Sequence, residues 1–560
     1  MKKYRVSALI LAMIMIIACF AACGTAGSNS GSESKGSAST APTDKPDASA
    51  TEPTEEPTDE PEEPAGLYPL AEETHLTVLG PIYAPRAGGI VETWQDTTFY
   101  QAASKATNIW LDYDCVATEA YNAQFNVVLA SGDMPDMFYQ GLRQYAGSAD
   151  QGIEEGLFAN IADYLDYCPD YVAALEEYGY TNNVKTDTGN MVSFYTIAKN
   201  APVGMMGFVT AQEYLDEIGM EAPKTYEDYF NVLKALKTEK GFKEPITMGY
   251  MGAVMGDYLC AGFDVSLYSH FILEYANKGF YQKDGTVHYG FLEDGFKEYV
   301  TMMNEWYNEG LFSPDFNTEN ENPTSPDYLA KISGGETGIA LIDSSYIDTL
   351  ESQTGLDFIP LQDAVKNVGD KTHLGASKDK EMDATYMISA DSENIEAAVL
   401  WNNYWFTEEG SMLCNWGIEG ETYEMVDGKP QFTDLLLNNP DGLSLSQTTY
   451  VYIGKLGVYD NARDFAMYSD QVSSLHETWD TNKDNAYKIP QGTTMTADES
   501  SDYNSKFSDI NTLVQESLVK FIVGDKPLDE IDAFVEELHK MGIDDCIGYW
   551  QAALDRFNQR

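Results

Sequence analysis

The segment between Gly24 and Pro64 sets the strongest limit on where this chain can fold. It consists of Ser, Gly, Ala, Thr, Glu, Pro and other small or polar residues, with no large apolar side chain. Such a segment cannot bury enough surface to offset the entropy lost on ordering, so we predict a disordered tether over residues 24–66. A flexible coil of this length spans about 35 Å root-mean-square. Folding is therefore expected from about Leu67 to Arg560.

The remaining length and the charge narrow the class of protein. At about 100–200 residues per domain, 560 residues allow two to four domains. The chain has 34 Lys and Arg against 90 Asp and Glu, a net charge of -56. A field of that sign repels polyanions and excludes a nucleic-acid partner. It also disfavours an anionic small ligand, although a local basic pocket could still hold one.

The first 23 residues have the pattern of an export signal. Lys2, Lys3 and Arg5 precede an apolar run of about 15 residues, which is shorter than the roughly 20 needed to span a bilayer. The ending Phe20-Ala21-Ala22-Cys23-Gly24 resembles the bacterial lipobox, although Phe20 stands where that motif prefers Leu. The resemblance implies a lipoprotein signal peptide over 1–23, with acyl chains on Cys23 that anchor the chain to the extracellular face of the cell membrane. The alternative is a plain signal peptide with an incidental Cys.

The cysteines after the signal region do not form a recognisable framework. There are five of them, an odd number, and no Cys-x-x-Cys occurs. Disulfide-rich, zinc-ribbon and thioredoxin-type proteins are therefore disfavoured. We expect these cysteines to be buried apolar residues: Cys115, Cys168, Cys260, Cys414 and Cys546.

From residue 67 onward the hydrophobic pattern predicts an α/β protein, because short apolar strands alternate with longer amphipathic helices. Strands are expected at residues 74–80, 137–139 and 338–342. Helices are expected at residues 118–131, 163–175, 211–218, 226–236, 291–309, 394–406, 510–521 and 528–540.

Several stretches, in this order along the chain, resemble the large-lipoprotein branch of the extracellular solute-binding proteins of family 1, which serve ABC sugar importers. They include Leu129-Ala130-Ser131-Gly132-Asp133-Met134-Pro135-Asp136, Trp306-Tyr307-Asn308-Glu309-Gly310-Leu311, Gly335-Glu336-Thr337-Gly338 and Gly417-Ile418-Glu419-Gly420. Gly207-Phe208-Val209-Thr210 departs from the family pattern, which leaves ligand contacts from that segment open.

The resemblance implies a two-lobed, periplasmic-binding-protein-like fold of type II, with a hinge and an interlobe cleft. Mapped onto this chain, lobe 1 takes residues 67–200 and 361–410, and lobe 2 takes residues 201–360 and 411–560. The resemblance further implies a monomer that captures a sugar, expected from the net charge to be a neutral oligosaccharide, and delivers it to the permease subunits of an ABC transporter. No cofactor, metal or catalysis is required.

Aromatic and polar residues in the expected cleft loops are the candidate ligand-binding residues, because sugars offer an apolar ring face and a rim of hydroxyls. They are Trp94, Gln95, Asp96, Asp136, Tyr139, Tyr250, Asp257, Tyr258, Tyr346, Trp416 and Glu419. For each aromatic residue the alternative role is core packing. For Asp136 and Glu419 it is helix capping or turn stabilisation.

Other functions remain open at this stage. A peptide or other small-solute receptor would have the same architecture. A surface glycan-degrading enzyme would need two carboxylates about 5–9.5 Å apart, and Asp133 with Asp136 or Glu419 with Glu421 are weak candidates. A signalling or adhesion lipoprotein would bind another protein instead. The stretch Asp480-Thr481-Asn482-Lys483-Asp484 resembles the start of a calcium loop but lacks its Gly and Glu.

Overall fold

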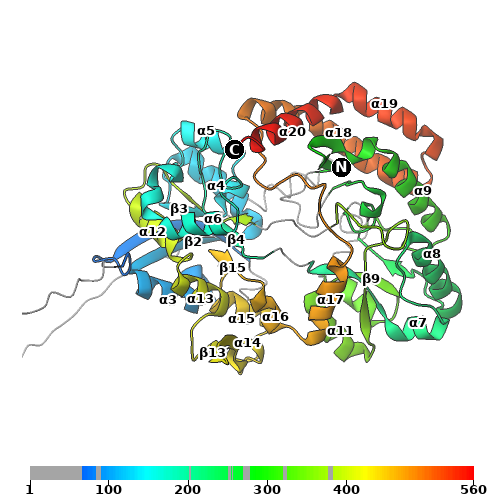
Figure 1. Ribbon diagram of the computed structural model, residues 1–560, viewed down its shortest axis with the longest axis horizontal. Helices are drawn as coiled ribbons and strands as arrows, with labels where there is room; N and C mark the ends of the chain where they lie inside the picture. The colour runs from blue at the N-terminus through cyan, green and yellow to red at the C-terminus, as the bar shows by residue number, and fades with distance from the viewer. Residues whose placement is uncertain are drawn as a thin grey trace, which may run out of the picture. The chain divides into compact units, whose positions relative to one another are not determined.

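A four-stranded sheet organises the first of two hydrophobic cores (Figure 1). Its order is β12-β3-β1-β2, in which β1 runs parallel to both β2 and β3, and β12 is antiparallel to β3. The strands are β1 (Thr74–Ile82), β2 (Ile109–Ala117), β3 (Met137–Tyr139) and β12 (Tyr386–Ile388). This computed structural model describes residues 66–83, 90–200, 204–249, 254, 256–268, 278–318, 325–375 and 382–560. The predicted signal peptide, the tether up to residue 65, Cys23 and Tyr250 lie outside the described residues.

Helices cover both faces of this sheet because successive strand residues point to opposite sides. Leu76 and Val78 of β1 share a core with α3 and α12, whereas Leu79 packs with α4 on the other face. These helices are α3 (Thr98–Thr107), α4 (Thr118–Ser131) and α12 (Ile395–Tyr404). The sheet is thus buried on both faces, as expected for an α/β layer.

The second core surrounds another four-stranded sheet, of order β10-β5-β9-β6. Here β5 is antiparallel to both β9 and β10, and β6 is parallel to β9. The strands are β5 (Met206–Ala211), β6 (Ile246–Thr247), β9 (Ile339–Asp343) and β10 (Phe358–Leu361). The helices that contribute to this core are α7 (Gln212–Ile218), α8 (Tyr226–Ala235), α9 (Asp294–Asn308), α10 (Pro326–Ser333), α11 (Ile347–Thr354), α17 (Asp470–Asp480), α18 (Ala497–Val523), α19 (Ile531–Met541) and α20 (Ile543–Phe557). The hairpin of β7 (Phe280–Lys283) and β8 (Thr286–Tyr289) packs against the same core.

The chain passes between the two cores three times, and each passage adjoins one small sheet of order β11-β4-β15. Its strands are β4 (Tyr195–Ala198), β11 (Met382–Ala384) and β15 (Val458–Tyr459). The chain leaves the first core through β4 and enters the second core at Met206. It returns after Ala364 through β11, and it leaves the first core again through β15 before it reaches Val472 of the second core. Three crossing segments are therefore held side by side by backbone hydrogen bonds.

The two cores divide the chain somewhat differently from the predicted lobes. Leu413, Cys414, Leu456 and Val458 belong to the first core, although residues 411–560 were assigned to lobe 2. Leu361 and Ala364 belong to the second core, although residues 361–410 were assigned to lobe 1. Two further helices, α5 (Ala149–Glu154) and α6 (Pro169–Glu177), precede β4. After α12 come α13 (Glu408–Trp416), the β13–β14 hairpin (Tyr423–Val426 and Lys429–Phe432), α14 (Asp434–Leu437), α15 (Leu445–Tyr452) and, after β15, α16 (Ala462–Met467).

The cysteine prediction agrees with the structure in its main point. Cys168, Cys260, Cys414 and Cys546 are buried, Cys115 is half-buried, and all five are free. Burial raises the pKa of Cys414 to about 11, so its thiol is protonated at neutral pH. Over the described ranges, no helix combines the length and the apolar character that crossing a bilayer demands.

Candidate binding pocket

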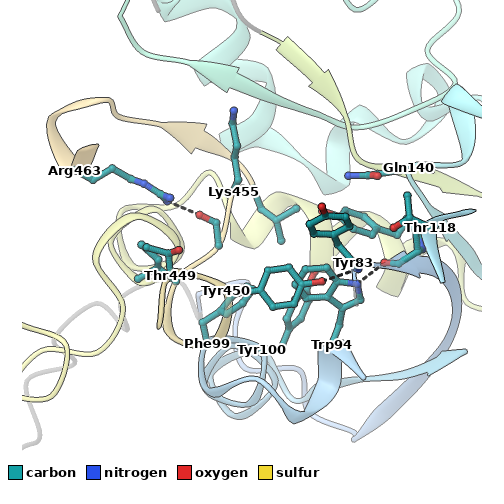
Figure 2. Close-up of a pocket in the computed structure, with 15 residues that line it drawn as sticks. Tyr83, Trp94, Phe99, Tyr100, Thr118, Gln140, Thr449, Tyr450, Lys455 and Arg463 are labelled. Atoms are coloured by element: carbon teal, nitrogen blue, oxygen red, sulfur yellow. Dashed lines mark hydrogen bonds between the residues drawn. The ribbon is translucent and has the colours of Figure 1, made fainter. Parts of the chain in front are cut away.

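A pocket of about 290 Å³ opens beside the first core, where residues 81–140 meet residues 449–463 (Figure 2). Its described lining combines aromatic rings with a few polar side chains. The lining residues are Pro81, Tyr83, Trp94, Phe99, Tyr100, Thr118, Tyr139, Gln140, Thr449, Tyr450, Ile453, Gly454, Lys455, Leu456 and Arg463.

Trp94 is the centre of an aromatic cluster that forms one wall of the pocket. Its ring centroid lies 4.5 Å from that of Tyr450, 5.9 Å from Tyr139 and 6.1 Å from Tyr100. Tyr450 comes from α15, more than 300 residues further along the chain, and its hydroxyl oxygen accepts a hydrogen bond of 3.1 Å from the Tyr83 backbone N–H. Flat rings of this kind complement the apolar face of a ring-shaped ligand.

Trp94 is held by short-range contacts that the local sequence provides. Its indole Nε1–H donates to the Pro81 carbonyl at 2.9 Å. The one-turn helix Trp94–Asp96 is capped by Thr93, and the Asp96 carboxylate accepts hydrogen bonds from the N–H and hydroxyl of Thr93. Gln95 Oε1 accepts a hydrogen bond of 2.6 Å from the Tyr113 N–H in β2. Of the three predicted neighbours, Trp94 therefore lines the pocket, whereas Gln95 and Asp96 fix its position.

A cluster of tyrosine hydroxyls lies behind the aromatic wall. Tyr100 lines the pocket, and its hydroxyl lies 2.7 Å from that of Tyr386 and 3.3 Å from that of Tyr113. Burial raises the pKa of all three hydroxyls well above the usual value. They are therefore neutral at physiological pH and act as hydrogen-bonding groups that stiffen the wall.

The polar side of the pocket contains Thr118, Gln140, Thr449, Lys455 and Arg463. Gln140 has a positive φ of 55°, a conformation uncommon outside glycine, and its N–H donates to the Thr385 carbonyl at 2.6 Å. Such backbone conformations occur preferentially at functional sites. Figure 2 shows the side chains of Gln140 and Lys455 on the same side of the aromatic rings.

Tyr139 is the second predicted residue that lines the pocket, but Asp136, three residues earlier, does not. The Asp136 carboxylate accepts hydrogen bonds from the Thr77 N–H and hydroxyl, both at 2.8 Å, and from the Ser392 hydroxyl at 2.5 Å. Partial burial acts to raise its pKa, but these hydrogen bonds outweigh burial and lower it. Asp136 therefore joins three chain segments near the start of β3, in line with the turn-stabilising alternative.

Three other predicted residues lie in the part of the chain that builds the second core. Tyr258 is buried in that core and packs edge-on against Phe208. Tyr346 is half-buried against it. Asp257 is fully buried, and the Ser266 hydroxyl donates to its two carboxylate oxygens at 2.9 and 3.1 Å. The structure does not bring these residues to the described pocket.

Trp416 and Glu419 also lie away from the lining. Trp416 is 7% exposed and packs against Phe432, with ring centroids 4.7 Å apart, in a small core that also contains Tyr423 and Leu436. Glu419 is exposed at the turn before β13. Their predicted ligand-binding role remains a prediction, and their surroundings match the core-packing and turn alternatives.

Sequence reasoning missed the whole wall formed by residues 449–463. Tyr450, Lys455 and Arg463 line the pocket, yet nothing in the local pattern distinguishes them from other surface residues of a helix and loop. The only available signal was the density of aromatic residues at Tyr450 and Tyr452. Their importance comes from a tertiary contact with residues far earlier in the chain.

The described residues show no obvious metal centre. No group of three His, Cys, Asp or Glu side chains within the described ranges could hold a metal ion. In the calcium-like stretch, the Asp480 carboxylate accepts from the Gly204 N–H at 2.9 Å and Asp484 pairs with His373 at 2.7 Å. These carboxylates are therefore engaged by different parts of the protein.

Comparison with known proteins decides the family. The family model described as bacterial extracellular solute-binding protein matches residues 92–412, more than half of the 560 residues. The chain belongs to this family. Trp94 and Tyr139 lie inside the matched region, whereas Pro81 and Tyr83 precede it and the wall of residues 449–463 lies beyond it.

Individual relatives are distant but match over most of their length. Lipoprotein LipO of Bacillus subtilis is 20% identical, covering 85% of this chain and 89% of LipO. The fructooligosaccharide ABC transporter substrate-binding protein FusA of Streptococcus pneumoniae is 21% identical, covering 82% of this chain and 86% of FusA. The crystal structure of an extracellular solute-binding protein from Bifidobacterium longum subsp. infantis superposes with a TM-score of 0.71 at 20% identity, covering 87% of this chain and 98% of that one. The predicted two-lobed α/β fold of this solute-binding protein is confirmed.

Proposed function

We propose that this solute-binding protein captures an oligosaccharide outside the cell and delivers it to an ABC importer. The observation that carries the proposal is the pocket wall of Trp94, Tyr139 and Tyr450, whose rings lie within 6 Å of Trp94. A cluster of aromatic rings beside a few hydrogen-bonding groups suits a sugar, which has an apolar face and polar edges. The relative FusA is by name a fructooligosaccharide-binding protein of an ABC transporter, which supports the same class of ligand.

The crossing segments between the two cores support a hinge-closing mode of action. All three adjoin the small β11-β4-β15 sheet, so a rotation at its edge would move one core relative to the other without breaking either. Hinge closure around a ligand is a known switching mode, and an importer needs a difference in shape to recognise the loaded protein. This role requires no chemistry on the ligand.

The proposal includes a lipid anchor at Cys23 and a tether up to residue 66. LipO, a relative by sequence, is by name a lipoprotein. Expressed in a bacterium fed a radiolabelled fatty acid, the full chain should incorporate label, and Cys23→Ser should abolish it. Cys115→Ser serves as the matched control and should retain the label. Equal labelling of the Cys23→Ser chain would overturn the anchor.

A binding panel tests the ligand class. Thermal unfolding of the purified protein should be measured with neutral and acidic mono- and oligosaccharides and with short peptides, and each mixture should be analysed for breakdown products. A ligand at about 100 times its dissociation constant stabilises the fold by about 2.7 kcal/mol, which a melting curve detects readily. Stabilisation by a sugar without products is the expected result. Stabilisation by peptides alone would replace the ligand class, and products would indicate an enzyme.

A further inference from the structure

A lysine is almost completely buried beside the second core. The Lys483 side chain is 2% exposed, and its ammonium lies 3.4 Å from a carboxylate oxygen of Asp363, whose side chain is 4% exposed. Burial raises the pKa of Asp363, and the charge of Lys483 opposes that shift. Buried ion pairs are often no more stabilising than apolar side chains of similar volume, so this pair calls for a role other than stability.

Lys483 lies between two of the segments that cross from one core to the other. The first crossing segment runs between Ala198 of β4 and Met206 of β5, and the second runs between Ala364 and Met382 of β11. A Cβ added at Gly375 would lie 2.8 Å from Lys483 Cδ, and one added at Gly204 would lie 3.8 Å from Lys483 Nζ. The aliphatic part of Lys483 therefore lies against the second crossing segment, and its ammonium is close to the first.

The first crossing segment is attached to the second core through Asp480. This residue is the last of α17, and its Oδ2 accepts a hydrogen bond of 2.9 Å from the Gly204 N–H. Its Oδ1 would lie only 3.0 Å from a Cβ at Gly204. Asp480 also acts to raise the pKa of Asp363, as a nearby like charge does. Lys483 thus supplies positive charge close to both carboxylates.

The second crossing segment is attached on both sides of Lys483. Thr372 forms an isolated parallel bridge with Lys483. The Thr372 N–H donates to the Asn482 carbonyl at 2.8 Å, and the Asp484 N–H donates to the Thr372 carbonyl at 3.1 Å. The side-chain N–H₂ of Asn482 donates to the Asp363 carbonyl at 2.9 Å. The backbone around Lys483 therefore continues into the crossing segment through a short ladder of hydrogen bonds.

We propose that Lys483 is a positioning residue for hinge closure: its buried ammonium fixes the second-core ends of the first two crossing segments. The other ends of these segments are fixed in the β11-β4-β15 sheet. Fixing both ends limits the arrangements that the two cores adopt relative to each other. Specifying one conformation is a role for which buried charges are retained in some proteins. The inference rests on the proposed function, because it names a residue on which the hinge depends.

Hydrogen exchange tests the attachment of the crossing segments. In Lys483→Met, which removes the charge and keeps most of the length, amides in peptides containing Gly204 and in peptides containing residues 372–375 should exchange about tenfold faster. Peptides from β1 should exchange as in the wild type. Lys331→Met is the matched control: it removes the charge from another ion pair of the second core, with Glu244 at 2.9 Å, and should leave both crossing segments unchanged.

The distance between the two cores separates positioning from local packing. Spin labels would be attached through azide-bearing residues introduced at Ser131, the last residue of α4, and at Lys540 on α19, which leaves the native cysteines untouched. Both positions are exposed. Pulsed electron paramagnetic resonance should give a distribution of label distances about twofold broader in Lys483→Met than in the wild type or in Lys331→Met. A role confined to packing of the second core would not broaden it.

Asp480→Ala keeps the inference testable if Lys483→Met does not fold. This variant removes the acceptor of the Gly204 N–H, so exchange should become faster in the first crossing segment. Unchanged exchange there would overturn the inference. So would unchanged exchange in both segments of Lys483→Met, or an unchanged distance distribution despite faster exchange. These measurements use no sugar, so a failure of every sugar to bind would overturn the proposed function without altering them.

Discussion

Trp94 shows at the scale of one residue how the pocket combines fixed geometry with ring surface. Its N–H is taken by Pro81, and its ring is surrounded by those of Tyr100, Tyr139 and Tyr450. The side chain therefore has little freedom to lose when a ligand binds. Rigid aromatic side chains of this kind contribute disproportionately to binding energy.

Replacing Trp94 by alanine should weaken sugar binding by about 5- to 150-fold, since an aromatic contact with a ligand contributes about 1–3 kcal/mol. Calorimetric titration with the sugar identified in the panel measures the change. Trp550→Ala, in α20 beside the second core, is the control and should bind normally. An unchanged dissociation constant for Trp94→Ala would remove this residue from the site.

A second prediction concerns Asp257 and the dependence of the free energy of unfolding on pH. Burial raises its pKa to about 7, against the opposing charge of Lys488 and the hydrogen bond from Ser266. The unfolded carboxyl has a pKa of about 3.9, so between about pH 4 and pH 7 the folded state binds more protons than the unfolded state. This group's contribution to the free energy of unfolding therefore increases as the pH falls from about 7 to about 4 and is lost as the pH rises through the same window.

Asp257→Asn mimics the protonated form and should isolate this contribution. Relative to the wild type, the variant should be more stable at about pH 8 and should lose that advantage by about pH 4. Urea unfolding at the two pH values measures the difference. A constant difference between the two proteins across the range would show that Asp257 does not titrate in this way.

The sequence could predict individual site residues only where local contacts decide their position. Trp94 comes in the segment after β1 and Tyr139 is the last residue of β3, where side chains gather at the edge of a parallel sheet, and both line the pocket. Trp416 has the same aromatic character, but the hairpin and α14 cover it. Whether an aromatic residue is covered depends on segments far away in the sequence, so composition and spacing could not separate these cases.

At the scale of elements, the C-terminal helix α20 is joined to the loop before β4 by a cluster of ion pairs. Arg560 donates to the Asp187 carboxylate at 3.0 Å and to the carbonyls of Asn182 and Gly492, each at 3.0 Å. Arg556 pairs with both Asp187 and Glu499. The Asp187 and Arg560 side chains are only 16% and 7% exposed, so this contact is screened less than a surface pair.

Asp187→Asn should lower the free energy of unfolding by about 1–3 kcal/mol, because two guanidinium groups lose the carboxylate that they share. This value lies between those typical of exposed and of buried ion pairs. Chemical denaturation measures this loss. Glu536→Gln, which breaks the fully accessible pair with Lys540, is the control and should change stability by no more than about 0.5 kcal/mol. Equal effects of the two substitutions would show that the cluster is no stronger than a surface pair.

Helix bounds were predicted well where the sequence contains a residue that ends the helix. The helix expected at residues 118–131 is α4 with the same bounds, ended by Gly132 at a φ of 73°. The helix expected at residues 163–175 was wrong as a single element: a short helix over Ile161–Tyr167 and α6 (Pro169–Glu177) meet at Cys168. Pro169 disfavours helical geometry at the residue before it, and this local signal was overlooked.

At the scale of the whole molecule, the net charge of -56 is a source of self-repulsion. A charge this far from zero favours solubility but opposes compaction, and added salt reduces the repulsion. We therefore expect the melting temperature to rise when NaCl is increased from about 20 to about 300 mM. Calorimetry over this range, with sucrose at equal osmolarity as a control for non-ionic effects, measures the shift. A falling melting temperature would mean that specific ion pairs outweigh the general repulsion.

The two-lobed fold could be predicted because its motifs recur in register along the chain, whereas the lobe boundaries could not. The predicted boundary after residue 410 falls inside α13 (Glu408–Trp416), and Leu413 and Cys414, just beyond it, still belong to the first core. Both cores are built from buried apolar side chains, so the sequence of α13 does not reveal which one it joins. Only the contacts made after folding assign it.

The pocket walls come from two stretches separated by more than 300 residues, 81–140 and 449–463. A growing chain completes the first wall early, but the proposed binding site is complete only when synthesis and folding have passed residue 463. Under the proposed function, ligand binding is therefore a test of integrity, because a truncated or half-folded molecule that retains Trp94 and its sheet would lack the second wall.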